Sequence, residues 1–260
     1  MIGNKRKTLE HLIIKSYIKC LEKGIPTSLD FPLFCSPRDD LEKRIKKNET
    51  LINIFKTYTK RIVRNIPHYI FLLTDLEGYL LEFVYCKRKY KNLSNLGITY
   101  GISLKEESCG TNAVSLALTT MKTARITQEN HYCKLFKDWD CIATPLKIDN
   151  TIIGCLDISA IGMVLPKEAE EILELLAYKM VNEYIKISLK DSKENLEEKL
   201  NSKQIKILQL SAEGHKELAI ALEIGISIST VKYHKKEIIK KMKVKNFKQA
   251  ITKAIRMNLI

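Results

Sequence analysis

Residues 200–242 read LNSKQIKILQLSAEGHKELAIALEIGISISTVKYHKKEIIKKM and show apolar residues at helical spacing in three successive stretches. Asn201 is suited to cap a first helix, because Gln204 stands three positions later as the second member of a capping box. The apolar side of that helix is formed by Ile205, Leu208 and Leu210. Gly214 stands where a left-handed residue ends a helix. The first stretch therefore predicts a helix between Asn201 and Gly214.

Two further helices follow, separated by a glycine-containing turn. Residues 224–226, Ile-Gly-Ile, form the turn, and Ser227 caps a third helix that runs to about Met242. The inward side of the second helix is expected at Leu218, Ala219 and Leu222. Two helices joined by such a turn form the unit that places its second helix in the major groove of DNA. Residues 200–260 therefore predict an all-α helix-turn-helix domain that binds DNA.

Positive charge is concentrated in the same region. Residues 200–260 hold 13 Lys plus Arg against 4 Asp plus Glu, a net charge of +9 out of +14 for the chain. Eight lysines lie between Lys232 and Lys248, opposed only by Glu237. Such clustering is typical of a surface that meets a phosphate backbone. The alternative is a solvated lysine face, since lysine outnumbers arginine 36 to 8 in the whole chain. A general bias toward lysine does not explain why the positive charge coincides with a helix-turn-helix pattern.

Residues 200–257 resemble the C-terminal effector domain of LuxR-type (NarL-type) transcription regulators, a four-helix module. The matching pieces are A-E-G, A-x-x-I-x-I-S, T-V-K-x-H, I-x-x-K-M and V-x-N-F-x-Q-A. The family commonly has a Lys-Glu pair before the buried isoleucine of its second helix. Leu218-Ala219 takes that place in this chain, so we expect a backbone contact or a surface salt bridge to be missing.

The resemblance also implies roles in DNA binding. Base contacts fall to Lys232, Tyr233 and Lys236, which share one face of the third helix at i, i+1 and i+4. Phosphate contacts fall to Ser229 and Thr230 at the helix start. Lys240 and Lys243 are further candidates for DNA binding. His234 suits a phosphate contact and a packing role equally well. The fourth helix, from about Phe247 to Met257, often forms the dimer contact in this family.

The rest of the chain is long enough for one core of about 150 residues. No stretch approaches the roughly 18 consecutive apolar residues that span a membrane, and the charged N-terminus lacks a signal peptide. The seven cysteines are odd in number and include no C-x-x-C pair, which favours reduced thiols over disulfides or a structural zinc. We therefore expect a cytoplasmic protein without membrane, metal or cofactor.

Residues 41–190 predict an α+β domain, an antiparallel sheet flanked by helices. One amphipathic helix is expected over 41–65, a short one over 111–120 and a long one opened by Pro166. Two strand pairs are expected, 69–74 with 79–85 and 141–147 with 151–159. Residues 191–199 are charged and predict a helix extension or a linker to the domain at 200–260.

From about residue 10 to 162 the chain is similar to the sensory part of acetoin-catabolism-type activators, which is a leader segment followed by a GAF domain. Matching pieces include S-Y-x-x-C-L-E-K-G from Ser16, G-T-N-A from Gly110 and W-D-C-I-A-T-P-L from Trp139. The resemblance assigns 1–40 to the leader and 41–190 to a GAF-like domain. Those activators continue into an ATPase, but this chain has no G-x-x-x-x-G-K-[S/T] loop, so its output must be direct DNA binding.

A GAF-like sheet forms the floor of a small-molecule pocket, here roofed by about 97–112 and 126–140. Candidate ligand contacts are Cys109, Thr111, Asn112, His131, Tyr132 and Trp139. Each has a plainer alternative: Thr111 and Asn112 cap a helix, the aromatic residues pack under a loop, and the cysteine is an inert buried thiol. A thiol before a helix N-terminus can also have a lowered pKa and sense oxidants. Asp75 and Asp157 lie in no catalytic arrangement, so no enzyme is expected.

The leading hypothesis is a transcription regulator in which a GAF-like domain senses a small-molecule effector and controls the helix-turn-helix domain. Its expected partners are double-stranded DNA, the effector and a second copy of the chain, with RNA polymerase as a further candidate. A phosphorylated receiver domain is excluded, because Asp39-Asp40 follows Pro37 rather than a strand. The open alternatives are a redox or metal sensor and a constitutive DNA binder whose GAF-like domain only dimerises.

Overall fold

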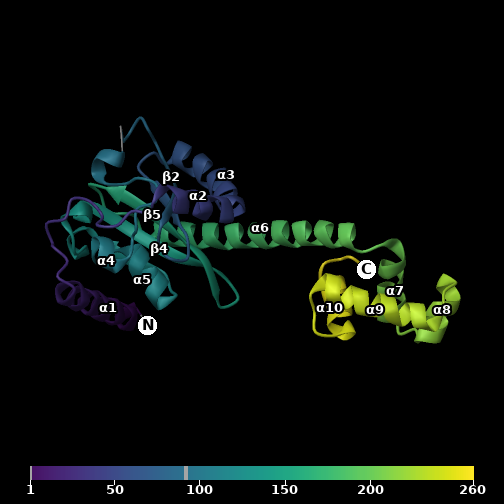
Figure 1. Ribbon diagram of the computed structural model, residues 1–260. Helices are drawn as coiled ribbons and strands as arrows, with labels where there is room; N and C mark the ends of the chain where they lie inside the picture. Colours follow the sequence, from purple (N-terminus) through teal and green to yellow (C-terminus); the bar gives the residue numbers. More distant parts are fainter. Residues whose placement is uncertain (1, 91–92) are drawn as a thin grey trace. The chain divides into compact units, whose positions relative to one another are not determined.

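The computed structural model describes residues 2–90 and 93–260 and divides the chain into two compact units, Met1–Tyr184 and Ile185–Ile260. The boundary lies inside one long helix, α6 (Glu168–Lys199), so residues 191–199 are helical. The first unit is an antiparallel sheet with helices, and the second is all helical (Figure 1). The expected fold class, a GAF-like α+β domain followed by a helical domain, is confirmed.

The sheet has five strands in the order β2-β1-β5-β4-β3, with every neighbouring pair antiparallel. Their bounds are β1 (Ile70–Thr74), β2 (Leu80–Tyr85), β3 (Ala124–Thr127), β4 (Trp139–Ile148) and β5 (Thr151–Ile161). Both expected hairpins are present, and the first strand pairs with the last, Leu72 opposite Asp157. The edge strand β3 was not expected, because four residues are too few for a periodic pattern.

Helices cover both faces of this sheet (Figure 1). One face carries α2 (Arg38–Lys47) and α3 (Glu49–Asn65), and the other carries α1 (Ile2–Glu22), α4 (Glu106–Cys109) and α5 (Ala113–Thr120). Short 3-10 turns occupy Leu93–Leu96, Gln128–Asn130 and Lys134–Phe136. Because both faces are covered, all five residues of β1 are buried.

The prediction of a single helix over 41–65 is wrong. The helix is interrupted at Asn48 (φ −106°, ψ 14°), where α2 ends and α3 begins. The side-chain amide of Asn48 donates to the carbonyl oxygen of Arg44 at 2.8 Å, a local bond that competes with continued helix. Apolar spacing continues across the break, so the pattern alone did not indicate it.

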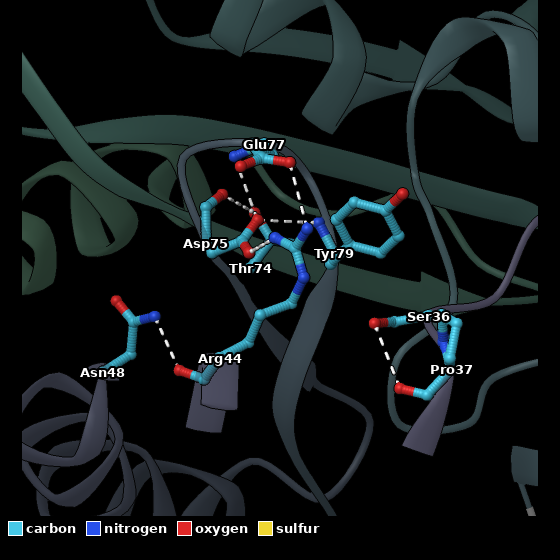
Figure 2. A network of polar contacts seen from close by, with 8 residues as sticks. All are labelled: Ser36, Pro37, Arg44, Asn48, Thr74, Asp75, Glu77 and Tyr79. Carbon is cyan, nitrogen blue, oxygen red and sulfur yellow. Dashed lines mark hydrogen bonds and ion pairs between the residues drawn. The ribbon is translucent and has the colours of Figure 1, made fainter. Parts of the chain in front are cut away.

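Arg44 fastens α2 to the turn between β1 and β2 (Figure 2). Its guanidinium contacts the Asp75 carboxylate at 2.5 Å and the Glu77 carboxylate at 3.1 Å, and it lies 4.0 Å from the centre of the Tyr79 ring. The other oxygen of Asp75 accepts the backbone N–H groups of Glu77 and Tyr79 at 2.9 and 3.0 Å. Asp75 therefore has a structural role in holding this turn.

The leader segment is part of the first unit and lies over the segments expected to roof a pocket. Backbone N–H groups of Lys134 and Leu135 donate to the carbonyl oxygens of Thr27 and Leu29, both at 2.8 Å, and Leu33 N–H donates to Ser108. In α1, the Ser16 hydroxyl lies 2.7 Å from that of Thr111 and also bonds the Glu106 carboxylate. Cys20 and Ile25 are buried in the same core cluster as α5.

The second unit contains four helices after α6: α7 (Ser202–Ala212), α8 (Glu217–Ile224), α9 (Ile228–Met242) and α10 (Phe247–Arg256). The capping box of Asn201 and Gln204, the Ser227 cap and the left-handed Gly214 (φ +90°) are all as expected. The core of this unit is built from Ile207, Leu208, Leu210, Ile220, Val231, Ile238, Met242, Ala250 and Ala254.

Two expectations about α8 are wrong. Leu218 and Leu222 are 59% and 76% exposed, whereas Ile220 and Ala221 are buried. The helix begins at Glu217, and packing selects its other apolar face. The salt bridge expected to be missing is present, because Glu217 itself supplies the carboxylate and contacts the Lys235 ammonium at 3.2 Å.

Candidate functional site

The helix α9 has one exposed polar face and one buried apolar face. Ser229, Lys232, Tyr233, Lys236 and Lys240 are exposed, and their spacing of i, i+3, i+4, i+7 and i+11 places them in one stripe along the helix. Val231, Ile238 and Met242 are buried in the core of the unit. The division of faces expected from the spacing is therefore present in the structure.

The N-terminus of α9 is organised around Ser227. Its hydroxyl accepts the Thr230 N–H at 3.1 Å and lies 2.7 and 2.8 Å from the hydroxyls of Ser229 and Thr230. Ser229 is exposed and Thr230 is half-buried. Amide groups at a helix N-terminus favour phosphate, so this end of the helix is suited to a backbone contact.

The lysines of α9 divide into two groups. Lys235 and Lys241 point to partners inside the unit, namely the Glu217 carboxylate and the Gln204 side-chain oxygen at 2.8 Å. Lys236 and Lys240 are exposed, and so is Lys243, which ends the helix in a left-handed conformation (φ +53°). The Lys232 ammonium lies 4.0 Å from Glu217, an exposed contact that costs little to break.

His234 is half-buried. Among the described residues, its Nδ1 atom is buried without a hydrogen-bond partner, and its ring lies 5.7 Å from that of Tyr233. The open choice between a phosphate contact and a packing role for His234 is not tested by this geometry.

The first unit contains a small internal cavity between the sheet and α5. It has a volume of about 10 Å³, about what one water molecule needs. Its lining combines apolar and polar side chains from β1, β4, β5, the 97–112 segment, α5 and the 3-10 turn before β4: Leu72, Leu104, Asn112, Ala113, Val114, Phe136, Trp139, Cys141, Asp157 and Ser159.

Asp157 is the one ionisable carboxyl group among these lining residues. It lies in the middle of β5, between Leu72 of β1 and Ala143 of β4, and is 2% exposed. Burial raises the pKa of Asp157 to about 7, although a hydrogen bond from the Ser159 hydroxyl lowers it in part. Residues with such shifted pKa values gather at functional sites. An acidic residue inside an otherwise apolar central strand was the available sequence signal.

Two of the six expected ligand contacts, Asn112 and Trp139, line this cavity. The Asn112 side chain caps α5: its oxygen accepts the Ser115 N–H at 2.9 Å, and its amide donates to the carbonyl oxygens of Leu104 and Gly110, also at 2.9 Å. The plainer alternative for Asn112, a helix cap, is therefore present in the structure.

The other four expected contacts lie outside the lining of the cavity. Thr111 and Tyr132 contact the leader, since the Tyr132 hydroxyl donates to the Ile25 carbonyl oxygen at 2.9 Å. Gly110 allows this packing, because a Cβ atom there would lie 2.7 Å from the Tyr132 ring. Complete burial raises the pKa of Cys109 well above its ordinary value, as in the inert buried thiol and unlike the oxidant-sensing alternative.

His131 is fully buried, and burial lowers its pKa to about 4. Its Nδ1 atom lies 3.1 Å from the Gln128 carbonyl oxygen, which can only accept, so the proton of the neutral ring sits on Nδ1. Within residues 2–90 and 93–260, the Nε2 atom has no hydrogen-bond partner. The Nε2 atom of His131 is therefore a buried hydrogen-bond acceptor.

The described residues hold no group of three or more His, Cys, Asp or Glu side chains arranged to bind a metal ion. None of the helices in the part of the chain that the structure describes is both long and apolar enough to cross a membrane.

Comparisons with known proteins divide the chain in the same way. A family model described as "Bacterial regulatory proteins, luxR family" matches residues 198–254. A signal-transduction and transcriptional-control protein of Clostridium beijerinckii is 27% identical over 158 residues, 60% of this chain and 25% of that protein. An acetoin catabolism regulatory protein of Cupriavidus necator is 30% identical over 117 residues, 45% of this chain and 17% of that protein. The chain thus matches a quarter or less of the length of these relatives.

One solved structure shares the fold of the larger part of the chain. It is the E. coli DhaR(N)-DhaL complex, with a TM-score of 0.63 and 16% identity, covering 68% of this chain and 61% of that one. The chain therefore carries, over residues 198–254, a DNA-binding helix-turn-helix domain of the LuxR family of bacterial regulatory proteins, preceded by a GAF-like domain that resembles those of DhaR and the acetoin regulators.

Proposed function

We propose that this chain regulates transcription as a homodimer that binds a specific double-stranded DNA site through α9 and responds to a small molecule in its GAF-like domain. The observation that supports it most is the exposed stripe on α9, in a unit with a net charge of +9 over 200–260. Lys232, Tyr233 and Lys236 would contact bases, and Ser229, Thr230, Lys240 and Lys243 would contact phosphates.

The effector would occupy an enlarged form of the cavity at Asp157. A carboxyl group with a pKa of about 7 accepts a hydrogen bond from a hydroxyl group when ionised and donates one to a keto oxygen when protonated. Ser159 and Trp139 would supply a second polar group and an aromatic wall. A short hydroxy-ketone suits this chemistry, and the name of the Cupriavidus necator relative points to acetoin as the first compound to test.

Alanine at Lys232 or Lys236 should weaken binding to the specific site by about 1–3 kcal/mol, or roughly 5- to 150-fold, if the side chain reads a base. The site would first be selected from random-sequence duplexes by the full-length protein, and affinity measured by gel-shift titration. Lys203→Ala, an exposed lysine outside α9, is the matched control and should change affinity little. Lys243→Ala should weaken specific and nonspecific DNA equally. If neither Lys232→Ala nor Lys236→Ala differs from the control, the assigned face is wrong.

An effector identified by thermal shift should change operator affinity about 5- to 150-fold, the usual range for allosteric coupling. The signal would pass through α6, the only segment that joins the two units. Four residues inserted near Asp191 should abolish the change and leave effector binding intact, because they rotate one end of the helix by about 40° relative to the other. A seven-residue insertion nearly restores the helical phase and serves as the control. An unchanged response in the four-residue variant would show that α6 does not transmit the signal.

A further inference from the structure

The helix α6 carries an apolar stripe that nothing in the described structure covers. Leu175, Tyr178 and Leu189 are 57%, 67% and 45% exposed and lie on one face of the helix, so they form a contiguous exposed row. Asn182 and Ile185 are half-exposed and lie between them in sequence. The five positions are separated by three, four, three and four residues, which is the spacing of a coiled-coil seam.

The opposite face of the helix is already used within the first unit. Ala169, Leu173, Leu176, Ala177 and Met180 are buried there. At 100° per residue, the mean direction of this buried set lies roughly 180° from that of the exposed stripe. The stripe is therefore a second apolar face, additional to the one that the fold requires.

The residues of the stripe indicate which partner would cover it. Leu175, Asn182 and Leu189 fall at the a positions of the heptad, and Tyr178 and Ile185 at the d positions. A single asparagine at an a position favours two parallel strands in one register, because the two amides bond each other across the axis. Glu174 and Lys179 fall at the flanking g and e positions. In a parallel pair, Glu174 of each copy would face Lys179 of the other, so the charges are complementary to a second copy of the same helix.

We propose that α6 pairs in parallel with α6 of a second copy of this chain, through Leu175, Tyr178, Asn182, Ile185 and Leu189. The inference rests on the homodimer of the proposed function and assigns its interface. It places the dimer axis along the helix that joins the sensor domain to the DNA-binding domain. The two copies of α9 would then be delivered to DNA in one symmetric arrangement.

Cysteine cross-linking of the full-length protein tests the seam. Ile185→Cys should form a disulfide-linked dimer under mild oxidation, because equivalent d residues meet at the axis. Glu183→Cys, two positions earlier at an outward b position, is the matched control and should remain uncross-linked. Equal cross-linking of the two variants, or none at Ile185→Cys in a protein that is dimeric by light scattering, overturns the interface.

Charge at the seam gives a second, independent readout. Tyr178→Lys should raise the dissociation constant of the dimer by about 100-fold or more, since it brings like charges together at the axis. Because Tyr178 is exposed within one chain, the variant should keep the circular dichroism of the parent. Glu183→Lys should leave association unchanged. Asn182→Leu should tighten association but lower the yield of the Ile185→Cys disulfide, because the register is no longer fixed. Weaker association of Asn182→Leu would contradict the assigned seam.

DNA binding measured on the same samples separates this inference from the proposed function. A monomeric protein that still requires Lys236 for specific binding would overturn the interface and leave the DNA-reading face intact. A dimer cross-linked at Ile185→Cys that selects no DNA site would support the interface and contradict the proposed function.

Discussion

Replacing Arg125 by alanine should lower the free energy of unfolding by about 3–5 kcal/mol, the cost of leaving one partner of a buried ion pair alone. Arg125, on β3, contacts both carboxylate oxygens of Asp140 on β4, at 2.6 and 3.2 Å. Asp140 is fully buried. Its remaining donor is the backbone N–H of Leu165 at 2.7 Å, and the Leu165 carbonyl oxygen in turn accepts from Arg125. The variant therefore leaves the Asp140 carboxylate without its positively charged partner. It also removes a hydrogen bond to Leu165, in the segment that leads into α6.

Urea unfolding of the full-length protein gives the measurement. Arg61→Ala, an exposed arginine of α3, is the matched control and should change stability by less than about 0.5 kcal/mol. The double variant of Arg125→Ala with Asp140→Ala should be less destabilised than the sum of the two single variants, since it leaves no unpaired charge. A loss below about 1 kcal/mol for Arg125→Ala would show that the pair is not the anchor of β3.

The second large effect concerns pH. The pKa of Asp157 is about 7 in the folded chain against an ordinary value of 3.8. Between these values the unfolded chain has released a proton that the folded chain retains, so stability falls as pH rises, by up to about 1.4 kcal/mol per pH unit. Above pH 7 both states are ionised and this contribution becomes constant. Asp157→Asn removes it, and should therefore stabilise the protein more at pH 8 than at pH 5, by about 2–3 kcal/mol.

The comparison is between the variant and the parent at each pH, so that contributions from all other carboxyl groups cancel. Glu183→Gln, which replaces a half-exposed carboxyl group on α6, serves as the control. If the difference between Asp157→Asn and the parent is the same at pH 5 and pH 8, Asp157 is ionised in the folded protein throughout this range. Its proposed role as a hydrogen-bond donor to a keto oxygen would then be excluded.

Features set by neighbouring residues were predictable from the sequence. The Asn201 and Ser227 caps and the Gly214 ending each depend on atoms within a few residues of one another, so their signals are local. The same holds for the hairpin turn around Asp149, which occupies the left-handed region. The exposed stripe of α9 followed from helical spacing once the buried face at Val231 and Ile238 was recognised.

Features decided by tertiary packing were not predictable in this way. Both faces of the eight-residue helix α8 are apolar, and only contact with α7 and α9 selects Ile220 over Leu222. The surroundings of two expected ligand contacts were decided by packing in the same way. Thr111 and Tyr132 carry suitable chemical groups, but the leader occupies them, and its contacts span about 100 residues of sequence.

These long-range contacts have a consequence for folding during synthesis on the ribosome. Helix α1 is synthesised well before residues that contact it: Ser16 and Thr111 are separated by 95 positions. At a synthesis rate of about 5–20 residues per second, that interval lasts about 5–20 s. During this time Cys20, completely buried in the finished fold, lacks its partners. Nascent-chain length, rather than helix formation, thus sets the earliest moment at which the leader can dock.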